Sequence, residues 1–393
     1  EDVIYAHHIL TTLRLVLERM GRAEHTDLTI HMDKILPQLY KLLITPSVQQ
    51  MDKRTVATEP RLLIDAGRII TFIVQRMHLH QQKRLAIDLR RAYFDGHVDG
   101  LIGEYELYIE KAFLPFEPDA PESQRNLCIL YAHPLFAMRK EVFDDAQETA
   151  RFCNLLFEGM LSWSNELRHE PLCKLLASLL NKKAEVLSPF IDEILPNFWR
   201  TCVADGQATK RRVALRAWAW IMRGMIIRSD SRAYEGVANL IALLADNHFG
   251  KEAARILAVL SQEDNGVITK KNFAVTRMLY KQRFYSYILP RLVEGSKLAP
   301  DSAAATPYLI GLSSLLQSMP KRTMISELSK LVPLLLRALE LNELDLRSHV
   351  IDTLALLVRA APEMVKSQAA TIVDTLIKNA VCADAKDSEA AVH

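Results

Sequence analysis

The residues best placed to do chemistry are the acids of segment 95–100, DGHVDG, with Glu106 at the twelfth position. This spacing approximates the calcium loop of an EF-hand, in which oxygen ligands and a sixth-position glycine surround the ion. His97 stands at the third position, where a nitrogen ligand suits calcium poorly, and the sequence has no second loop to pair with this one. We therefore predict an exposed turn between helices and no metal at Asp95, His97, Asp99 or Glu106.

The remaining residues whose side chains could catalyse a reaction or bind a ligand are scattered along the sequence. The sequence has no G-x-S-x-G, phosphate loop or dinucleotide motif, and its histidine pairs lack the i, i+4 spacing of a helical metal site. The five cysteines are odd in number and ungrouped, which predicts free buried thiols: Cys128, Cys153, Cys173, Cys202 and Cys382. We expect no catalytic centre, no cofactor and no metal, so the chain is predicted not to be an enzyme.

Charge is nearly balanced, with 49 Lys and Arg against 47 Asp and Glu. Because nucleic-acid binding usually needs a basic excess, we predict no direct contact with DNA or RNA. No stretch approaches the roughly 20 apolar residues of a membrane span. The sequence also has short basic clusters, which would either contact phosphate or acidic partners or form solvated helix faces. We favour the solvated helix faces. These clusters are Lys83-Arg84 with Arg90-Arg91, Lys210-Arg211-Arg212 with Arg216, Lys270-Lys271, and Lys321-Arg322.

The elements that must position these residues repeat one phrase: an aliphatic pair, a proline, and an apolar run with helical spacing. The phrase contains Pro37, Pro196, Pro290 and Pro333; the last two are 43 residues apart and the middle two 94. A period near 40–47 residues in a helical sequence is typical of HEAT and armadillo repeats. We predict an all-α HEAT-repeat α-solenoid, a right-handed stack of antiparallel helix pairs with these prolines inside or opening the first helices.

The apolar spacing predicts successive helix pairs and an organisation in three parts. The pairs are 30–44 with 61–76, 192–203 with 211–227, 239–245 with 250–260, 281–297 with 307–319, and a hairpin over 325–361. Trp199, Trp218 and Trp220 are expected to pack between hairpins. Residues 1–112 form N-terminal hairpins, 113–123 a proline-rich acidic loop, and 124–393 a C-terminal array.

The last repeat is predicted to be incomplete. Residues 368–378 carry a first-helix stripe, and a polar turn follows at 383–389. The partner helix should begin near Val392, yet the sequence ends at His393 and begins with Glu1 rather than Met. We expect a piece of a longer protein.

The run from about Lys210 to Leu341 resembles the C-terminal region of the MMS-nineteen family. The resemblance is carried by MLYKQRFY at 278–285, ILPRL at 288–292, YLIGLSSLL at 308–316, MPK at 319–321, EL at 327–328 and LVPLLL at 331–336. A weaker echo, KLLASLLNK, lies at 174–182. Together these cover about a third of the chain, and residues 1–120 match only as generic HEAT helices.

This family supplies the large HEAT-repeat subunit of the cytosolic iron–sulfur protein assembly targeting complex. The resemblance implies a non-catalytic adaptor that docks the small carrier subunit and the WD-repeat propeller subunit. It further implies recruitment of apo iron–sulfur enzymes of DNA replication, repair and transcription, in cytoplasm and nucleus. The ungrouped cysteines agree with a chain that does not itself hold a cluster.

Partner-binding residues are expected on helix ridges, on turns within repeats and at the terminal repeat, because neighbouring hairpins cover the remaining surface. We predict Lys281, Arg283, Asn342, Glu343, Asp345, Arg347 and His349. Asp345 and Arg347 have an equally good structural role in the turn. The alternative is a karyopherin-like nuclear transport receptor or another HEAT-repeat interaction scaffold. A karyopherin would favour an acidic net charge and Trp-Asn arrays, and the sequence shows neither.

Overall fold

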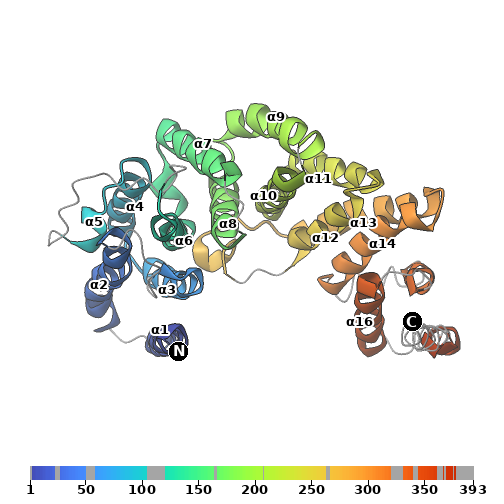
Figure 1. Ribbon diagram of the computed structural model, residues 1–393, viewed down its shortest axis with the longest axis horizontal. Coiled ribbons are helices and arrows are strands. Elements are labelled where there is room, and N and C mark those ends of the chain that lie inside the picture. Colours follow the sequence, from blue (N-terminus) through green and yellow to red (C-terminus); the bar gives the residue numbers. More distant parts are fainter. Residues whose placement is uncertain are drawn as a thin grey trace, which may run out of the picture. The chain divides into compact units, whose positions relative to one another are not determined.

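The part of the chain that the computed structural model describes consists of helices joined by turns and short loops (Figure 1). No strand occurs among those residues, and none of their helices is long and apolar enough to cross a membrane. The all-α prediction is therefore confirmed. The described residues are 2–22, 27–49, 58–103, 120–162, 166–206, 208–262, 266–319, 331–339, 344–360, 366, 369–374 and 376–377.

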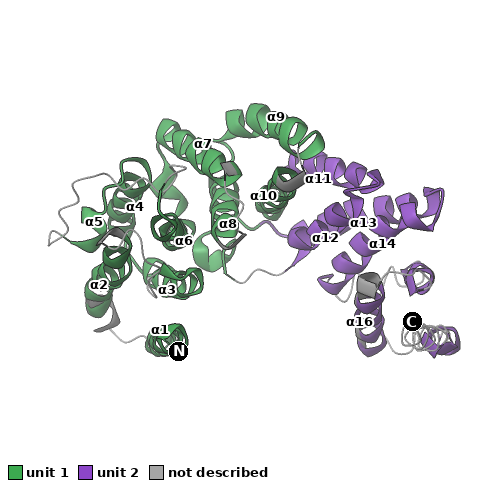
Figure 2. Ribbon diagram, in the orientation of Figure 1, with its two compact units in different colours: residues 1–228, 264–276 green, residues 229–263, 277–393 purple. Residues whose placement is uncertain are grey.

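The chain divides into two compact units, shown in different colours in Figure 2. The first comprises Glu1–Arg228 and Asp264–Thr276, and the second comprises Ser229–Glu263 and Arg277–His393. The chain thus enters the second unit, returns to the first for a short segment, and then completes the second.

The first unit is built in two layers. Its second-helix layer consists of α1 (Asp2–Arg22), α3 (Pro60–Val74), α6 (Glu122–Ala137), α8 (Glu166–Lys183) and α10 (Ala208–Arg228). Each of these helices packs on the next. The first-helix layer holds α2 (Asp27–Gln49), α4 (Leu79–Phe94), α7 (Ala146–Ser162) and a helical run formed by η3 (Phe190–Ile194), α9 (Leu195–Phe198) and η4 (Trp199–Ala204). Short helices α5 (Asp99–Ile102) and η2 (Lys140–Phe143) connect the pairs.

The second unit repeats this plan. Its first helices are α11 (Ala233–Ala242), continued by η5 (Leu243–Ala245), then α13 (Tyr280–Leu298) and residues 331–339. Its second helices are α12 (Gly250–Ser261), α14 (Ser302–Gln317) and α16 (Leu344–Ala360), in which α14 contacts both neighbours. Repeated helix pairs stacked in this way form a HEAT-repeat α-solenoid, as predicted.

The repeated prolines lie where the sequence places them, in the first-helix layer. Pro37 is inside α2, Pro290 is inside α13, and Pro333 lies in the helical residues 331–339. Pro196 opens α9 between two π-helical turns. Because proline has no N–H and crowds the preceding turn, the wider π-helical turns on either side of α9 accommodate Pro196 within one continuous helical run.

The tryptophans pack inside the first unit, as expected. Trp218 and Trp220 are 3% and 6% exposed, and the ring centroids of Trp199 and Trp218 are 4.8 Å apart. The predicted loop at 113–123 lies outside the described residues up to 119, so the division there stays a prediction. α3 and α6, on either side of it, pack together within one unit. Of the last repeat, Ile372 is buried, whereas 383–389 and Val392 lie outside the described residues.

Candidate partner-binding cleft

A cleft of about 1020 Å³ runs along the second-helix layer of the first unit. Side chains of α1, α3, α6 and α8 line it, and residues 266–273 close one side. The latter belong to the segment 266–276, which we call the return segment because it comes back from the second unit. The cleft is therefore built from consecutive repeats together with a piece of chain far away in the sequence.

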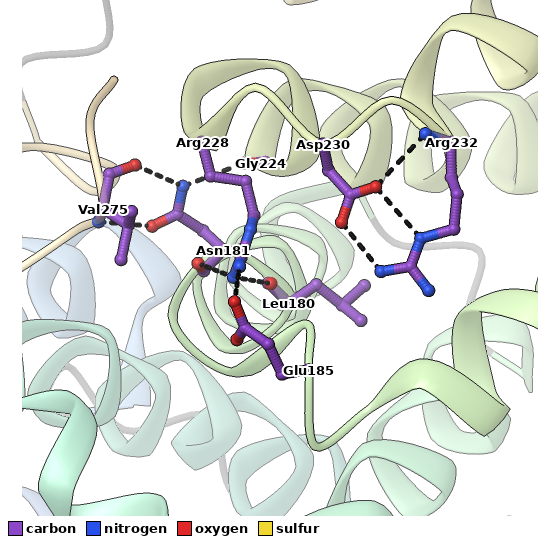
Figure 3. A network of polar contacts seen from close by, with 8 residues as sticks. All are labelled: Leu180, Asn181, Glu185, Gly224, Arg228, Asp230, Arg232 and Val275. Atoms are coloured by element: carbon purple, nitrogen blue, oxygen red, sulfur yellow. Dashed lines mark hydrogen bonds and ion pairs between the residues drawn. The ribbon is translucent and has the colours of Figure 1, made fainter. Parts of the chain in front are cut away.

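Asn181 of α8 holds the return segment in place, as Figure 3 shows. Its amide nitrogen donates to the carbonyl of Val275 at 3.1 Å, and its carbonyl accepts from the N–H of Val275 at 2.8 Å. The same nitrogen donates to the carbonyl of Gly224 on α10 at 2.8 Å. The Arg228 guanidinium donates to the backbone carbonyl of Asn181 at 2.6 Å and forms an ion pair with Glu185. Asn181 is fully buried, so its bond to Gly224 forms away from water, whereas its bonds to Val275 are partly buried.

Asn272 is the second anchor of the return segment. Its carbonyl accepts from the Gln75 amide, at the end of α3, over 2.6 Å, and its own amide donates to the carbonyls of Gly266 and Val267. Phe273 follows with a φ of 57° and carries the Arg139 guanidinium over its ring at 4.7 Å. These contacts fix η6 (Lys270–Asn272) and place two exposed lysines at the cleft.

Positive charge dominates the lining of the cleft. Seven cationic side chains face two carboxylates, an excess of five positive charges: Arg14, Arg22, Arg68, Arg76, Lys174, Lys270 and Lys271 against Glu18 and Glu170. Arg14 pairs with Glu18 and Lys174 with Glu170, each at 2.9 Å, and Arg68 pairs with Asp65 at 3.0 Å. Within the described part of the chain, no ion pair involves Arg22, Lys270 or Lys271.

Arg76 is held in a defined orientation. Its guanidinium carbon lies 3.6 Å from the centre of the Phe72 ring, and one nitrogen donates to the Phe72 carbonyl at 3.1 Å. Gly21 of α1 leaves room for this arrangement, since a Cβ there would lie 2.7 Å from the guanidinium. Burial lowers the pKa of Arg76 and the nearby Glu18 offsets part of this effect; the guanidinium is cationic because the ordinary pKa of arginine is far above physiological pH.

The histidine in the cleft lining contributes no positive charge at physiological pH. Burial lowers the pKa of His133 to about 3, with Lys174 and Arg68 acting in the same direction, so its ring is neutral at physiological pH. Lys182 is buried and donates to the carbonyls of Phe136 and Met138 at 2.8 and 2.6 Å. These bonds satisfy carbonyls at the C-terminal end of α6. The positive charge of the cleft therefore comes from the arginine and lysine side chains that line it.

The EF-hand-like segment adopts a turn between α4 and α5. Asp95, His97 and Asp99 are exposed, Gly96 has a φ of 70°, and Asp99 begins the short helix α5. Glu106 lies outside the described residues. No group of three or more potential ligands capable of holding a metal occurs where the structure is described. That the segment binds no calcium stays a prediction, which calorimetric titration with calcium tests.

The predicted partner-binding residues fall on two repeats of the second unit. Lys281 and Arg283 lie in the first turn of α13, and Arg347 lies in the first turn of α16. Asn342 and Glu343 lie outside the described residues, as do the side chains of Asp345 and His349, which belong to α16.

The two groups do not form one compact cluster. A three-residue turn after Leu298 makes α13 and α14 antiparallel, so first and second helices begin at opposite edges of the array. Arg283 begins a first helix and Arg347 a second helix. A site that includes both must therefore extend across the array, and their role in partner binding stays a prediction.

The residues of the cleft were not recognised as a site from the sequence. Lys270 and Lys271 are exposed, as the sequence predicts, and they also face the cleft. The sequence does contain a pattern among the other residues that line the cleft. Arg14, Glu18 and Arg22 follow one another at four-residue spacing, as do Arg68, Phe72 and Arg76. That spacing places each set on one helix face. Among the other clusters, Lys83, Arg84 and Arg91 are exposed as expected.

The prediction of a solvated face is wrong for Arg90, which belongs to the cluster at 83–91. Arg90 is 7% exposed and pairs with Glu148 at 2.6 Å, so it joins α4 to α7 rather than facing water.

The stacked helix pairs and their charged cleft define a helical-repeat protein of the HEAT class. More specifically, the chain belongs to the MMS19 C-terminal family, described as the C-terminal region of an RNAPII transcription regulator, whose model matches residues 1–392. The family expected from the sequence is thereby confirmed.

Curated relatives agree with this assignment. The chain is 24% identical over 375 residues to the DNA repair/transcription protein mms19 of Schizosaccharomyces pombe, covering 94% of this chain and 36% of that protein. It is 26% identical over 378 residues to the human MMS19 nucleotide excision repair protein homolog, covering 94% and 35%. The chain thus spans about a third of the length of these relatives. Among solved structures, Kap121p bound to RanGTP aligns with a TM-score of 0.46 and 13% identity, covering 94% of this chain and 34% of Kap121p.

Proposed function

We propose that this chain is a non-catalytic docking segment of a protein that serves DNA repair and transcription. The observation that carries the proposal is the match of the family model along residues 1–392. The printed names of the relatives, which refer to nucleotide excision repair and transcription, support the same role. A helical-repeat array provides long surfaces for partners, and this is the physical basis of a docking role.

The finer proposal is an adaptor of the cytosolic iron–sulfur assembly targeting complex. The chain would dock the small carrier subunit and the WD-repeat propeller subunit, and would recruit apo iron–sulfur enzymes in cytoplasm and nucleus. Lys281, Arg283 and Arg347 in the second unit are the proposed carrier contacts that the structure describes. The resemblance at 278–292 and 308–336 supports this proposal, since both segments fall in the second unit.

The thiols support an adaptor that holds no cluster of its own. Cys128, Cys153 and Cys173 are buried, and burial raises the pKa of each thiol. Iron–sulfur clusters are bound by thiolates, so these thiols are poor ligands. Cys202 is half-buried on a separate helical turn, and Cys382 lies outside the described residues.

Size-exclusion chromatography of purified components tests the adaptor role. The 393-residue chain is mixed with the carrier subunit, with the propeller subunit, and with both. The proposal predicts that the carrier co-elutes with the chain and that the propeller joins only when the carrier is present. Separate elution of the carrier at micromolar concentrations of both proteins would contradict the finer proposal and leave the family assignment untouched.

A further inference from the structure

We propose that the cleft of the first unit is the docking site for an acidic, partly apolar segment of a partner protein. This inference deepens the docking role by naming the chemistry of one partner. It concerns the first unit, whereas the proposed carrier contacts lie in the second, so the two proposals can fail separately.

The first argument is charge complementarity. An excess of five positive charges lines one concave surface, although the whole chain carries only +2. Concave surfaces lined by one sign of charge focus the field and attract oppositely charged ligands. Arg22, Lys270 and Lys271 join no ion pair within the described residues, so binding carboxylates would not require breaking such pairs.

The guanidinium of Arg76 is preorganised for binding a carboxylate. Arg76 is stacked on Phe72 and bonded to its carbonyl, which leaves further N–H donors of the planar group for a carboxylate. Arginine binds carboxylates with two parallel hydrogen bonds, and a fixed guanidinium loses less side-chain entropy when it does so. The backbone that carries Lys270 and Lys271 is fixed by the contacts of Asn272 and Phe273, while the two lysine side chains are exposed at the cleft.

The third argument distinguishes a peptide from a nucleic acid. Proteins that bind single strands stack bases on aromatic rings. In this cleft a guanidinium already covers one face of Phe72 and one face of Phe273. Glu18 and Glu170 stand among the cations and would repel a continuous phosphate backbone. The lining also includes apolar side chains, of which Ile64 is partly exposed and Phe136 and Val267 are largely buried, and the exposed part of Ile64 suits an apolar side chain placed between acids.

The test is fluorescence anisotropy with a labelled peptide that alternates glutamate with leucine and phenylalanine. In the cleft variant, Lys270→Glu and Lys271→Glu reverse two exposed charges. In the matched control, Lys83→Glu and Arg84→Glu reverse two adjacent exposed charges on α4, outside the cleft. We expect the cleft variant to lose about tenfold in affinity and the control to change by less than about twofold.

A second variant, Gly21→Val, separates geometry from charge. It adds no charge, but its side chain would overlap the Arg76 guanidinium and the tip of the Phe72 ring, both of which are able to move. We expect weaker peptide binding with a thermal unfolding midpoint close to that of the unchanged chain.

Three outcomes would overturn the inference. The first is peptide binding that neither cleft variant weakens. The second is an equal loss in the α4 control, which would indicate attraction to the whole surface. The third is displacement of the peptide by a single-stranded oligonucleotide as readily as by unlabelled peptide, which would assign the cleft to nucleic acid. Carrier co-elution with the cleft variant reports separately on the proposed function.

Discussion

The side-chain amide of Asn181 forms two hydrogen bonds with the backbone of Val275, 94 residues further along the chain. This pairing attaches the return segment to α8 and so completes the cleft. A side chain that satisfies both the N–H and the C=O of one residue replaces the hydrogen bonds that a helix or strand would supply. The buried amide of Asn181 therefore holds one end of the return segment, and Asn272 anchors the other.

Replacing Asn181 with alanine should release the return segment. The change leaves the N–H of Val275 and the carbonyl of Gly224 without their partner, so we expect a loss of about 2–3 kcal/mol in the free energy of unfolding. Limited trypsin digestion should then cleave faster at Lys270 and Lys271. Asn247→Ala is the control, because Asn247 is exposed. Unchanged cleavage at the two lysines would contradict the anchoring role of Asn181.

Two helical glycines should respond in opposite ways to alanine. A Cβ at Gly224 of α10 would overlap the backbone carbonyl oxygen of Ala177 on α8, so one of the two helices would have to shift. We expect Gly224→Ala to destabilise the chain by about 1–3 kcal/mol, as overpacking does. Gly21→Ala meets only side-chain ends, and the gain in helix propensity should make it neutral or stabilising by up to about 1 kcal/mol. Urea unfolding of both variants checks this contrast, and equal effects would refute it.

The buried Lys182 should make stability depend on pH. Burial lowers its pKa from 10.5 to about 7, while the unfolded chain keeps the ordinary value. Between these values the unfolded state holds one more proton than the folded state, so the free energy of unfolding rises with pH. Below pH 7 Lys182 is protonated in both the folded and the unfolded state, so the full cost of burying its charge is subtracted from the free energy of unfolding.

The comparison with Lys182→Met isolates this effect, because other groups titrate equally in both proteins. The free energy of unfolding of the unchanged chain, minus that of the variant, should increase from pH 7 towards pH 10. A difference that stays constant across this window would show that Lys182 has an ordinary pKa in the folded chain.

Charge reversal at Arg283 and Arg347 should weaken capture of the carrier subunit. Both residues begin helices of the second unit, and interface charges act mainly on specificity and association rate. We expect weaker carrier co-elution from Arg283→Glu with Arg347→Glu, and a thermal unfolding midpoint within a few degrees of the unchanged chain. Unimpaired capture would remove these residues from the proposed site. Because Arg283 and Arg347 lie at opposite edges of the array, comparing the two single variants shows which edge contributes to binding the carrier subunit.

The sequence predicts the array well because its signals are local. The proline phrase places Pro37 and Pro290 within first helices, and the spacing of apolar residues locates helices such as α13 and α14 to within a few residues. The π-helical turns beside Pro196 are missed, because periodicity does not distinguish a π-helical turn from an α-helical one.

The cleft was missed because its decisive contacts are long-range. The return segment has no helical periodicity, and nothing near Val275 indicates a bond to Asn181. Lys270 and Lys271 gain their significance only when this segment lies against α3, α6 and α8. The four-residue spacing of Arg68, Phe72 and Arg76 was visible in the sequence, but such faces are usually solvated.

The most direct test of the docking role is affinity purification of the tagged chain from cells, followed by mass spectrometry. The proposed adaptor role predicts recovery of the carrier subunit, the propeller subunit and iron–sulfur enzymes of DNA metabolism. A variant of the chain in which Arg283 and Arg347 of the second unit lose their charges should recover less of the carrier subunit. Recovery of a small GTPase with proteins bearing basic transport signals, and no assembly subunits, would contradict it and favour a nuclear transport receptor.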